Sequence, residues 1–334
     1  MLKEIEIQNF RCFEQIKIYG FERVNLIGGK NNAGKTALLE ALFLNFAPEA
    51  SSLGMLRELR REPDKAIEAM PDRAWDNLFY EVKKDRFIVI IGKDDNNNTD
   101  RVQIQLETNS VRYKIIFEFI RNEDQSTWSS TKLHPGGLMN YRISIDEVPI
   151  IPSFIRISGK KLTEAYDNAR LDDKDSEVLK AFQILDPTIE SVESFSIGEP
   201  TLYLRRKGEK RLPLSLFGDA INRVAEIILK LVNSEHKILL IDEIENGIHY
   251  KNQREFWRVL FRLAVELDTQ IFATTHSLEM LQAFADVGLK PDQECSSAYF
   301  ELAKKPKTNQ IIGIRRDLET LSYAIEHQKG VRGE

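Results

Sequence analysis

The N-terminal part of the chain alternates between apolar and polar positions, which predicts β-strands. Ile5 and Ile7 alternate with charged and amide residues, and the segment 15–19 repeats the alternation. A third strand is expected over residues 24–27, directly before a pair of glycines. The segment 36–46 is apolar on almost every side at helical length, so it predicts a helix that is buried all round.

The middle of the chain changes its hydrophobic period. Residues 51–85 are polar, and the pattern predicts mostly helical structure there, held by a few buried side chains. These expected anchors are Leu53, Leu56, Trp75, Leu78 and Phe79. Residues 86–92, 101–107 and 111–120 then predict three strands of an antiparallel meander, because apolar and polar side chains alternate along the second of them.

Loop, helix and strand signals follow one another after the meander. Residues 121–137 predict a loop, and residues 159–185 predict a charged helical segment. Strands are expected around 190–206, followed by a turn at 207–210.

From residue 211 onward, helical and short apolar segments alternate. The pattern predicts strands over 238–241 and 270–275, and helices over 220–232, over 251–266 and from Leu278. Such alternation is typical of a mainly parallel sheet that helices cover. Two more strands, 298–303 and 310–314, and a helix over 317–328 are expected after it.

Composition and charge narrow the class of protein. Of the 334 residues, 42% are hydrophobic and 30% are charged, which is enough for a core. The net charge of −5 excludes a generally basic coat for nucleic acid, although a local basic groove stays open. Cys12 and Cys295 stand in no metal-ligand spacing. Because the chain has neither a signal peptide nor an apolar run near the ~20 residues that span a bilayer, we expect a cytoplasmic protein without a membrane partner.

Residues 29–36 fit the pattern G-x-x-x-x-G-K-[ST] between an expected strand and an expected buried helix. In such a loop, backbone N–H groups surround phosphate oxygens, Lys35 reaches the β- and γ-phosphates, and the Thr36 hydroxyl binds Mg²⁺. The sequence therefore predicts a site for ATP and Mg. The residues of this site are Gly29, Asn31, Asn32, Ala33, Gly34, Lys35 and Thr36.

Asp242 and Glu243 directly follow the buried strand 238–241. The carboxyl end of a parallel strand lies at the ligand crevice of an α/β sheet. We therefore expect Asp242 to hold the Mg²⁺ through water, and Glu243 to polarise the attacking water. A strand that simply ends in polar residues is the alternative, and the phosphate loop upstream makes it the weaker interpretation.

Two further segments are candidates for the same site. His276 follows the strand 270–275, where it could donate a hydrogen bond to a γ-phosphate, although a histidine at a strand end is more often a satisfied polar residue. Ser277 is an expected N-cap. The segment 215–219 forms a Ser/Gly turn before a helix, which can bind an anion but is also an ordinary way to begin a helix.

Together these motifs resemble the ATP-binding-cassette (ABC) ATPases of the SMC/RecF/OLD group, over about residues 1–50 and 211–290. The opening 5–13, with Arg11, is similar to the first strand and turn of that group, and Asn31 stands where its phosphate loop has G-x-N-x-x-G-K. Segment 242–249 resembles a joined Walker B motif and D-loop.

The resemblance implies an α/β fold of the P-loop NTPase, ABC type, with a mixed sheet, an antiparallel β-subdomain and a helical insertion. The expected domains are a discontinuous nucleotide-binding unit, 1–85 and 211–334, and an insertion, 86–210. The resemblance also implies that His276 is a catalytic switch residue beside Glu243, and that Arg11 contacts the nucleotide.

The same resemblance implies a composite site and at least a homodimer. ATP bound at Lys35 of one subunit would be completed by the signature of a second, with Ser215, Gly218 and Asp219 as its candidate residues. No heptads run through 86–210, which argues against a long coiled-coil arm. The 58 residues after His276 are too few for a toprim nuclease domain.

The resemblance further implies an ATPase that senses a trigger and controls a separate effector protein, a toprim-like nuclease, in anti-phage defence. We expect that the chain itself does not cut nucleic acid. The first alternative is a RecF-like ATPase of DNA maintenance, and a second is an assembly protein that binds ATP with little turnover. Two basic clusters would serve DNA binding, although most charge runs are solvated faces. These clusters are Arg57, Arg60 and Arg61, and Lys83, Lys84 and Arg86.

Overall fold

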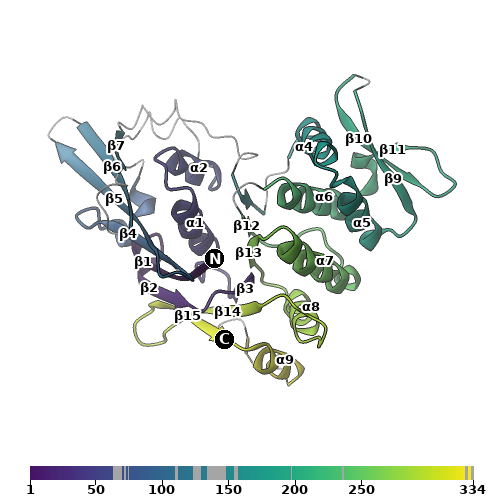
Figure 1. Cartoon of the computed structure of the whole chain (residues 1–334). Helices are drawn as coiled ribbons and strands as arrows, with labels where there is room; N and C mark the ends of the chain where they lie inside the picture. The colour runs from purple at the N-terminus through teal and green to yellow at the C-terminus, as the bar shows by residue number, and fades with distance from the viewer. Residues whose placement is uncertain are drawn as a thin grey trace.

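The computed structural model contains three β-sheets, two of them packed around one buried helix (Figure 1). It describes the chain except for residues 63–69, 71–72, 74, 110–111, 123–128, 134–147, 154–156, 197, 235–236, 328–329 and 332–334. Among the described residues, no helix is both long enough and apolar enough to cross a membrane.

The central sheet has the strand order β15-β14-β3-β13-β12-β8. Its strands are β3 (Val24–Gly29), β8 (Ile150–Ile151), β12 (Ile238–Ile241), β13 (Gln270–Thr274), β14 (Ser297–Lys304) and β15 (Ile311–Arg316). All neighbours pair in parallel except β15, which is antiparallel to β14. The predicted parallel sheet is confirmed, and so are the strands expected near residues 298–303 and 310–314.

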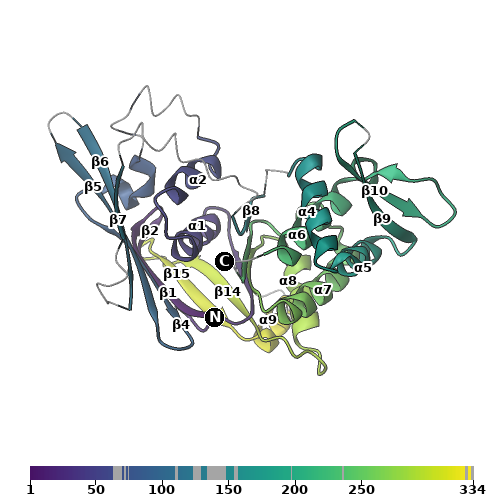
Figure 2. The ribbon, with the colours of Figure 1, turned by 45° about the horizontal axis from the view of Figure 1, so that its top comes forward.

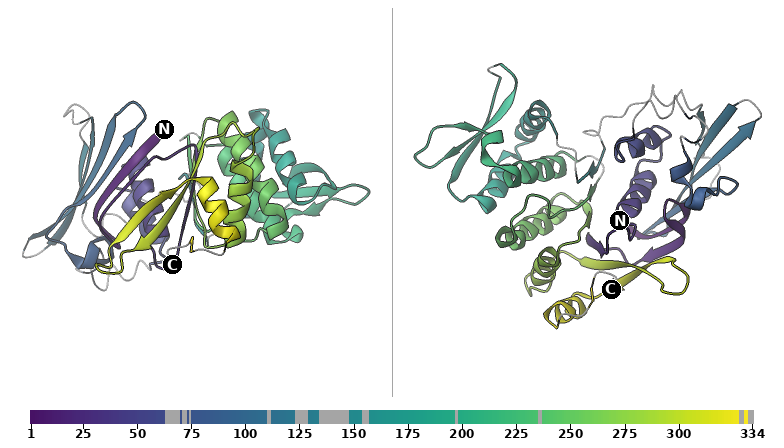
Figure 3. Two further views of the ribbon diagram at one scale, coloured as in Figure 1. Left: turned by 90° about the horizontal axis from the view of Figure 1, so that it is seen from below. Right: turned by 180° about the vertical axis from the view of Figure 1, so that it is seen from behind.

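Helices cover both faces of the central sheet (Figure 3). One face carries α6 (Asp219–Val232), α7 (Gln253–Glu266), α8 (Leu278–Gly288) and α9 (Leu318–Glu326). The other face carries α1 (Lys35–Phe46), whose residues 37–45 are all buried, as the sequence predicted.

Strand β12 contributes side chains to both hydrophobic cores. Leu239 and Ile241 pack into the core beneath α6 to α8, whereas Ile238 and Leu240 pack into the core around α1. Successive side chains of a strand point to opposite faces, so a strand of four buried residues must be apolar throughout. Because both faces of β12 are buried, residues 238–241 form a continuous apolar run in the sequence.

The second sheet is antiparallel, in the order β2-β1-β4-β5-β6-β7, and it encloses α1 from the other side. Its strands are β1 (Leu2–Phe10), β2 (Phe13–Tyr19), β4 (Ile88–Asp94), β5 (Thr99–Asn109), β6 (Arg112–Arg121) and β7 (Ser129–Leu133). The alternation predicted for β5 is confirmed, because Val102, Ile104 and Leu106 are buried.

Strand β7 corrects the expectation of a loop over residues 121–137. Residues 129–133 pair with β6 through the backbone at the edge of the sheet. A strand can form there without an apolar pattern, because the ladder of β6 supplies the hydrogen bonds whatever the side chains are. Residues 123–128 and 134–137 of the expected loop lie outside the described residues.

A three-stranded sheet lies at the far end of the molecule from β5 and β6 (Figure 2). It consists of β9 (Ile189–Phe195), β10 (Thr201–Arg206) and β11 (Leu212–Pro213), and it packs on α4 (Gly159–Leu171) and α5 (Asp175–Leu185). The Tyr166 hydroxyl, on α4, donates to the Val192 carbonyl at 2.8 Å and ties the helix to the sheet. The helices expected over 159–185 are confirmed.

The segment after α1 contains α2 (Ser52–Glu58) and two short 3₁₀ helices, Asp76–Leu78 and Tyr80–Val82. All five expected anchors between residues 53 and 79 are buried.

The division into 1–85 with 211–334 and an inserted 86–210 stays a proposal. Two strand pairs cross its boundaries, since β4 pairs with β1 and β8 pairs with β12.

Candidate functional site

A cavity of about 860 Å³ lies where β3 and β12 end and α1 begins. Three parts of the chain line it. They are residues 31–37 of the phosphate loop and its helix, Asp242 and Glu243 after β12, and a wall formed by Arg11, Cys12, Arg60, Glu62 and Asn77. The structure thus brings together most of the residues that the sequence assigned to a nucleotide site.

The loop between β3 and α1 has the backbone geometry of an anion cradle. Gly29 and Gly34 have φ of 150° and 93°, and Gly34 precedes α1 without a side-chain capping hydrogen bond. Glycine has no side chain that could cap the helix, so the first N–H groups of α1 can face an anion. A Cβ on Gly34 would come within 2.8 Å of the Cys12 Sγ, so glycine is required here for space as well as for conformation.

Lys35 lies across this loop. Its Nζ donates to the Gly29 carbonyl at 2.8 Å and to the Lys30 carbonyl at 3.1 Å. The ammonium group is thereby held on the inner side of the curve, where the uncapped N–H groups of α1 also lie. Backbone donors and one positive charge converge on the same space, as phosphate binding requires.

Thr36 and Asp242 meet at the base of the cavity. The Thr36 hydroxyl donates to the Asp242 carboxylate, at 3.2 Å to Oδ2 and 3.4 Å to Oδ1. A hydroxyl and a carboxylate at this separation are hard oxygen donors of the kind that Mg²⁺ prefers. The residues present therefore fit a divalent cation between them, which is the role that the sequence predicted for this pair.

Thr274, on β13, is a partner of Asp242 that the sequence did not reveal. Its buried hydroxyl donates to Asp242 Oδ1 at 2.6 Å and accepts from the Glu243 N–H at 2.9 Å. Burial raises the pKa of Asp242, and the hydrogen bond from Thr274 lowers it. The hydroxyl thus favours the charged form of Asp242, which is the form that a cation needs.

Glu243 lines the cavity in a strained backbone conformation. Its φ is 49°, in the left-handed region that a residue with a side chain seldom adopts. Besides the backbone bond to Thr274, its carboxylate Oε2 accepts from the Asn246 side chain at 3.0 Å. The turn after β12 therefore fixes the direction in which this carboxylate points.

His276 lies beside Glu245 and is not among the side chains that line the cavity. Its Nδ1 is 2.8 Å from Glu245 Oε1, and its backbone N–H donates to the same oxygen at 2.8 Å. The imidazole is half exposed. Ser277 is the N-cap of α8, as predicted, because its hydroxyl accepts from the Met280 N–H at 3.2 Å.

The candidate signature residues lie outside the cavity of their own chain. Ser215 belongs to a 3₁₀ helix, Leu214–Phe217, and Gly218 and Asp219 begin α6. Gly218 has φ of 84° and opens α6 without a side-chain cap. The neighbouring Leu216 is 68% exposed. This segment packs on the D-loop, since a Cβ on Gly247 would stand 3.4 Å from the Asp219 backbone.

The two basic clusters expected to serve DNA binding are largely engaged within the chain. Arg57 pairs with Glu62, and Arg60 pairs with Glu40 on the wall of the cavity. In the other cluster Lys83 pairs with Glu81 and Lys84 with Asp76. Of these four pairs, only that of Arg60 with Glu40 joins the clusters to α1, and the sequence could not indicate it because the two residues are brought together by folding.

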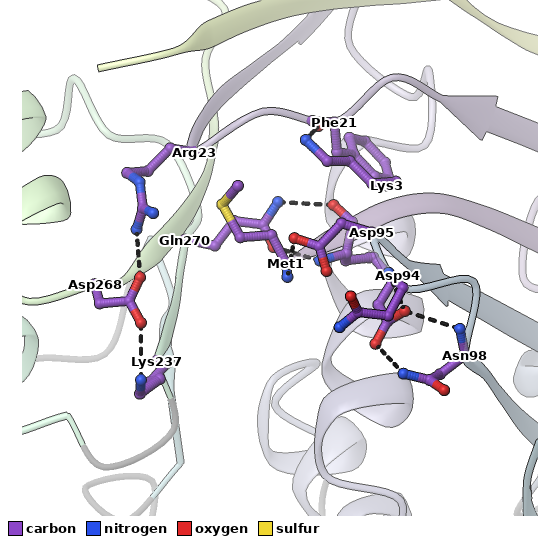
Figure 4. Close-up of polar contacts among 12 residues, drawn as sticks. Met1, Lys3, Phe21, Arg23, Asp94, Asp95, Asn98, Lys237, Asp268 and Gln270 are labelled. Carbon is purple, nitrogen blue, oxygen red and sulfur yellow. Dashed lines mark hydrogen bonds and ion pairs between the residues drawn. The ribbon is translucent and has the colours of Figure 1, made fainter. Parts of the chain in front are cut away.

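A second cavity, of about 600 Å³, lies at the opposite ends of the parallel strands (Figure 4). The Asp268 carboxylate forms ion pairs with Arg23 at 3.1 Å and with Lys237 at 2.8 Å. The Gln270 side chain donates to the Leu2 carbonyl and accepts from the Leu2 N–H, each at 2.9 Å. The contact of Gln270 with Leu2 joins β1 to the central sheet, and the ion pairs of Asp268 join the segments before β3 and β12. This cavity therefore has the features of a structural junction.

Comparisons with known proteins agree with the geometry of the first cavity. Residues 24–281 match the family described as "AAA domain, putative AbiEii toxin, Type IV TA system". A protein of Helicobacter pylori named ATP/GTP phosphatase is 24% identical over 383 aligned positions, which cover 100% of both chains. The DNA double-strand break repair Rad50 ATPase of Archaeoglobus fulgidus is 46% identical over 46 residues, which are 14% of this chain and 5% of that protein.

Solved structures share the fold. The SMC head domain from Thermotoga maritima superposes with a TM-score of 0.52 at 14% identity, covering 95% of this chain and 99% of that one. An SMC head bound to the C-winged helix domain of ScpA has a TM-score of 0.54 at 11% identity, covering 96% and 98%. The predicted ABC-type fold is thus confirmed. The chain belongs to the AAA-domain family named above, which makes it an ATPase, and it shares its fold with the SMC heads.

Proposed function

We propose that the chain hydrolyses ATP with Mg²⁺ in the cavity between the phosphate loop and the end of β12. The observation that carries this proposal is the contact between the Thr36 hydroxyl and the Asp242 carboxylate, which are 206 residues apart in sequence. Bound there, Mg²⁺ neutralises phosphate charge and orients the phosphates for in-line attack.

The side chains of the loop and of β12 divide the remaining tasks. Lys35 and the uncapped N–H groups of α1 bind phosphate oxygens. Glu243 orients a water molecule and takes up its proton, since its carboxylate lines the cavity and is held by Asn246. Arg11 lies on the wall of the cavity and contributes positive charge. To His276, whose ring lies beside Glu245, we assign a hydrogen bond to the γ-phosphate.

The active form is at least a homodimer with composite sites. Ser215, Gly218 and Asp219 lie beside the D-loop of their own chain, outside its cavity, and the exposed Leu216 is next to them. A segment of this kind can serve the cavity of a second copy. One of the SMC heads that share the fold is bound to a domain of ScpA, so partner binding occurs among proteins with this fold.

Thr274→Val is expected to reduce ATP turnover about 10-fold at neutral pH, because valine has nearly the same shape but cannot donate to Asp242. Without the hydrogen bond that lowers it, the pKa of Asp242 rises further, and the carboxylate becomes protonated at a higher pH. The acid limb of the profile of kcat/KM against pH therefore moves to higher pH. Thr274→Ser, which keeps the hydroxyl, is the control, and coincident profiles for the two variants would contradict the assignment.

In a mixing experiment, Lys35→Ala and Gly218→Trp are expected to be inactive separately and active together. If one chain supplies the loop and the other the signature, each mixed dimer contains one intact site of two. Free exchange in an equal mixture makes about half of the dimers mixed, so up to about a quarter of wild-type turnover returns. Nothing lies within 4 Å of a Cβ placed at Gly218 within its own chain, and Gly218→Ala, which strains the backbone at φ 84° in the same way but lacks the bulk, is the control. ATP turnover is the measurement. Full activity of Gly218→Trp by itself would refute the composite site.

We further propose that this cytoplasmic ATPase controls a separate effector protein in phage defence. The support is the family description, which names a toxin and a type IV toxin–antitoxin system. We assign any nuclease chemistry to the effector. Among the described residues there is no group of three or more His, Cys, Asp and Glu side chains that could hold a metal. DNA binding is less supported, because four cations of the basic clusters pair with acids of the same chain.

A further inference from the structure

Glu40 is a fully buried carboxylate in the helix that follows the phosphate loop. It lies on α1 and has no exposed surface. Between Thr36 and Phe46 it is the one charged residue in an otherwise apolar sequence. A buried charge is costly unless it is paired and hydrogen-bonded, so the partners of Glu40 indicate what the residue is for.

Both partners of Glu40 are arginines on the wall of the nucleotide cavity. Glu40 Oε2 accepts from Arg11 Nε at 2.9 Å. Arg60 binds the same carboxylate in a fork, with Nε 2.6 Å from Oε1 and Nη2 3.1 Å from Oε2. Arg11 comes from the turn between β1 and β2, and Arg60 from the segment after α2. One carboxylate on α1 therefore fixes two guanidinium groups that reach the cavity from different elements.

The cluster of Glu40, Arg11 and Arg60 has a net positive charge, and one N–H group of Arg11 lacks an acceptor among the described residues. Two guanidinium groups share one carboxylate, and Glu62 nearby pairs with Arg57 at 3.3 Å. The Arg11 side chain is only 8% exposed, and its Nη1 donates to the Asn77 carbonyl at 3.0 Å. Its Nη2 is buried without a hydrogen-bond partner among the described residues. A buried N–H that lacks an acceptor beside a cavity indicates a ligand that brings one.

We propose that Glu40 is a positioning residue for the nucleotide, which it serves by holding Arg11 and Arg60 at the wall of the cavity so that their surplus charge faces the phosphates. The inference rests on the proposed binding of ATP in this cavity. Glu40 itself contacts no ligand. Its effect on ATP binding passes through the two arginines, and this distinguishes it from a buried ion pair that only stabilises the fold.

Glu40→Gln tests the proposal in two backgrounds, the natural sequence and the double variant Arg11→Ala/Arg60→Ala. The measurement is the affinity for the non-hydrolysable analogue AMP-PNP with Mg²⁺, by calorimetry up to millimolar ligand. In the natural sequence we expect affinity to fall at least 10-fold, because both arginines lose their common anchor. In the double variant we expect a change of less than 2-fold, because Glu40 then has no arginine to position.

An equal loss of affinity in both backgrounds would overturn the proposal, as would unchanged affinity in the natural sequence. The midpoint of unfolding in urea, measured without nucleotide, is an independent test, because Glu40→Gln should change it in opposite directions in the two backgrounds. Glu40→Gln should lower the midpoint in the natural sequence and raise it in the double variant, where it removes a buried charge without partners. If Glu40→Gln does not fold, Glu40→Asp replaces it in both backgrounds, since one methylene less keeps the charge but cannot reach both arginines.

Two controls separate this inference from the proposed function. Glu301→Gln also removes a buried carboxylate that is paired with an arginine, Arg316, but outside the residues that line the cavity, so AMP-PNP affinity should stay within 2-fold. Lys35→Ala tests the cavity itself. If Lys35→Ala binds AMP-PNP like the natural chain, the proposed nucleotide site is wrong. If only Lys35→Ala loses affinity while Glu40→Gln keeps it, the site stands and the role of Glu40 is refuted.

Discussion

Glu243→Gln is expected to bind ATP with little change in affinity and to hydrolyse it at least 100-fold more slowly. Glutamine keeps the size of the side chain and can still hydrogen-bond to Asn246, but it cannot accept a proton from water. General-base catalysis contributes about 10²–10⁴-fold to a rate, so losing it affects turnover far more than binding. The substitution should therefore trap the nucleotide-bound assembly.

Single-turnover hydrolysis and nucleotide binding, measured side by side, check this expectation. A matched control is Glu266→Gln, at the exposed end of α7, where the carboxylate pairs with Arg262 and lies away from the cavity. It should hydrolyse ATP at the rate of the natural chain. Normal hydrolysis by Glu243→Gln would show that another group activates the water.

Lys35→Ala is expected to weaken ATP binding by at least 100-fold. Its ammonium donates to the Gly29 carbonyl at 2.8 Å, and among the residues that the structure describes no other lysine lines the cavity. Removing it takes away a charge-assisted contact to phosphate and one donor to each of the Gly29 and Lys30 carbonyls.

Lys30→Ala provides the control for Lys35→Ala, because it removes an equal charge from the same loop. Lys30 is exposed, and its side chain is not part of the lining of the cavity. ATP affinity, by calorimetry or by displacement of a fluorescent nucleotide, should change less than 3-fold in this variant. Similar losses in the two lysine variants would mean that general electrostatic attraction, and not contact at Lys35, holds the nucleotide.

The sequence predicted those parts of the site whose residues are neighbours in one continuous segment. The loop 29–36 and the pair Asp242 and Glu243 each follow a strand, and local pattern placed both correctly at strand ends. Thr36 and Asp242 were expected to share a cation, but the other contacts between distant segments were not predictable. Thr274 is 32 residues from Asp242, and its role depends on β12 and β13 pairing in one register. A threonine at a strand end has no local signal for that role.

Glu40 is visible in the sequence as a single acid within a mostly apolar helix, but this position alone does not indicate its role. A lone acid in an apolar helix must find a partner, yet the pattern names none. Its partners stand 29 and 20 residues away, at Arg11 and Arg60, and only the folded chain brings them to it. His276 illustrates the same limit, because the direction of its ring, toward Glu245, follows from the turn after β12.

The alternating side chains of β12 constrain how the site can respond to its ligand. A shift of this strand by one residue along its neighbours would exchange Leu239 and Ile241 with Ile238 and Leu240 between the two cores, at the cost of repacking both. Asp242 therefore cannot slide relative to the rest of the sheet. A movement of β12 on nucleotide binding would therefore disturb the packing on both of its faces, in the core around α1 and in the core beneath α6 to α8.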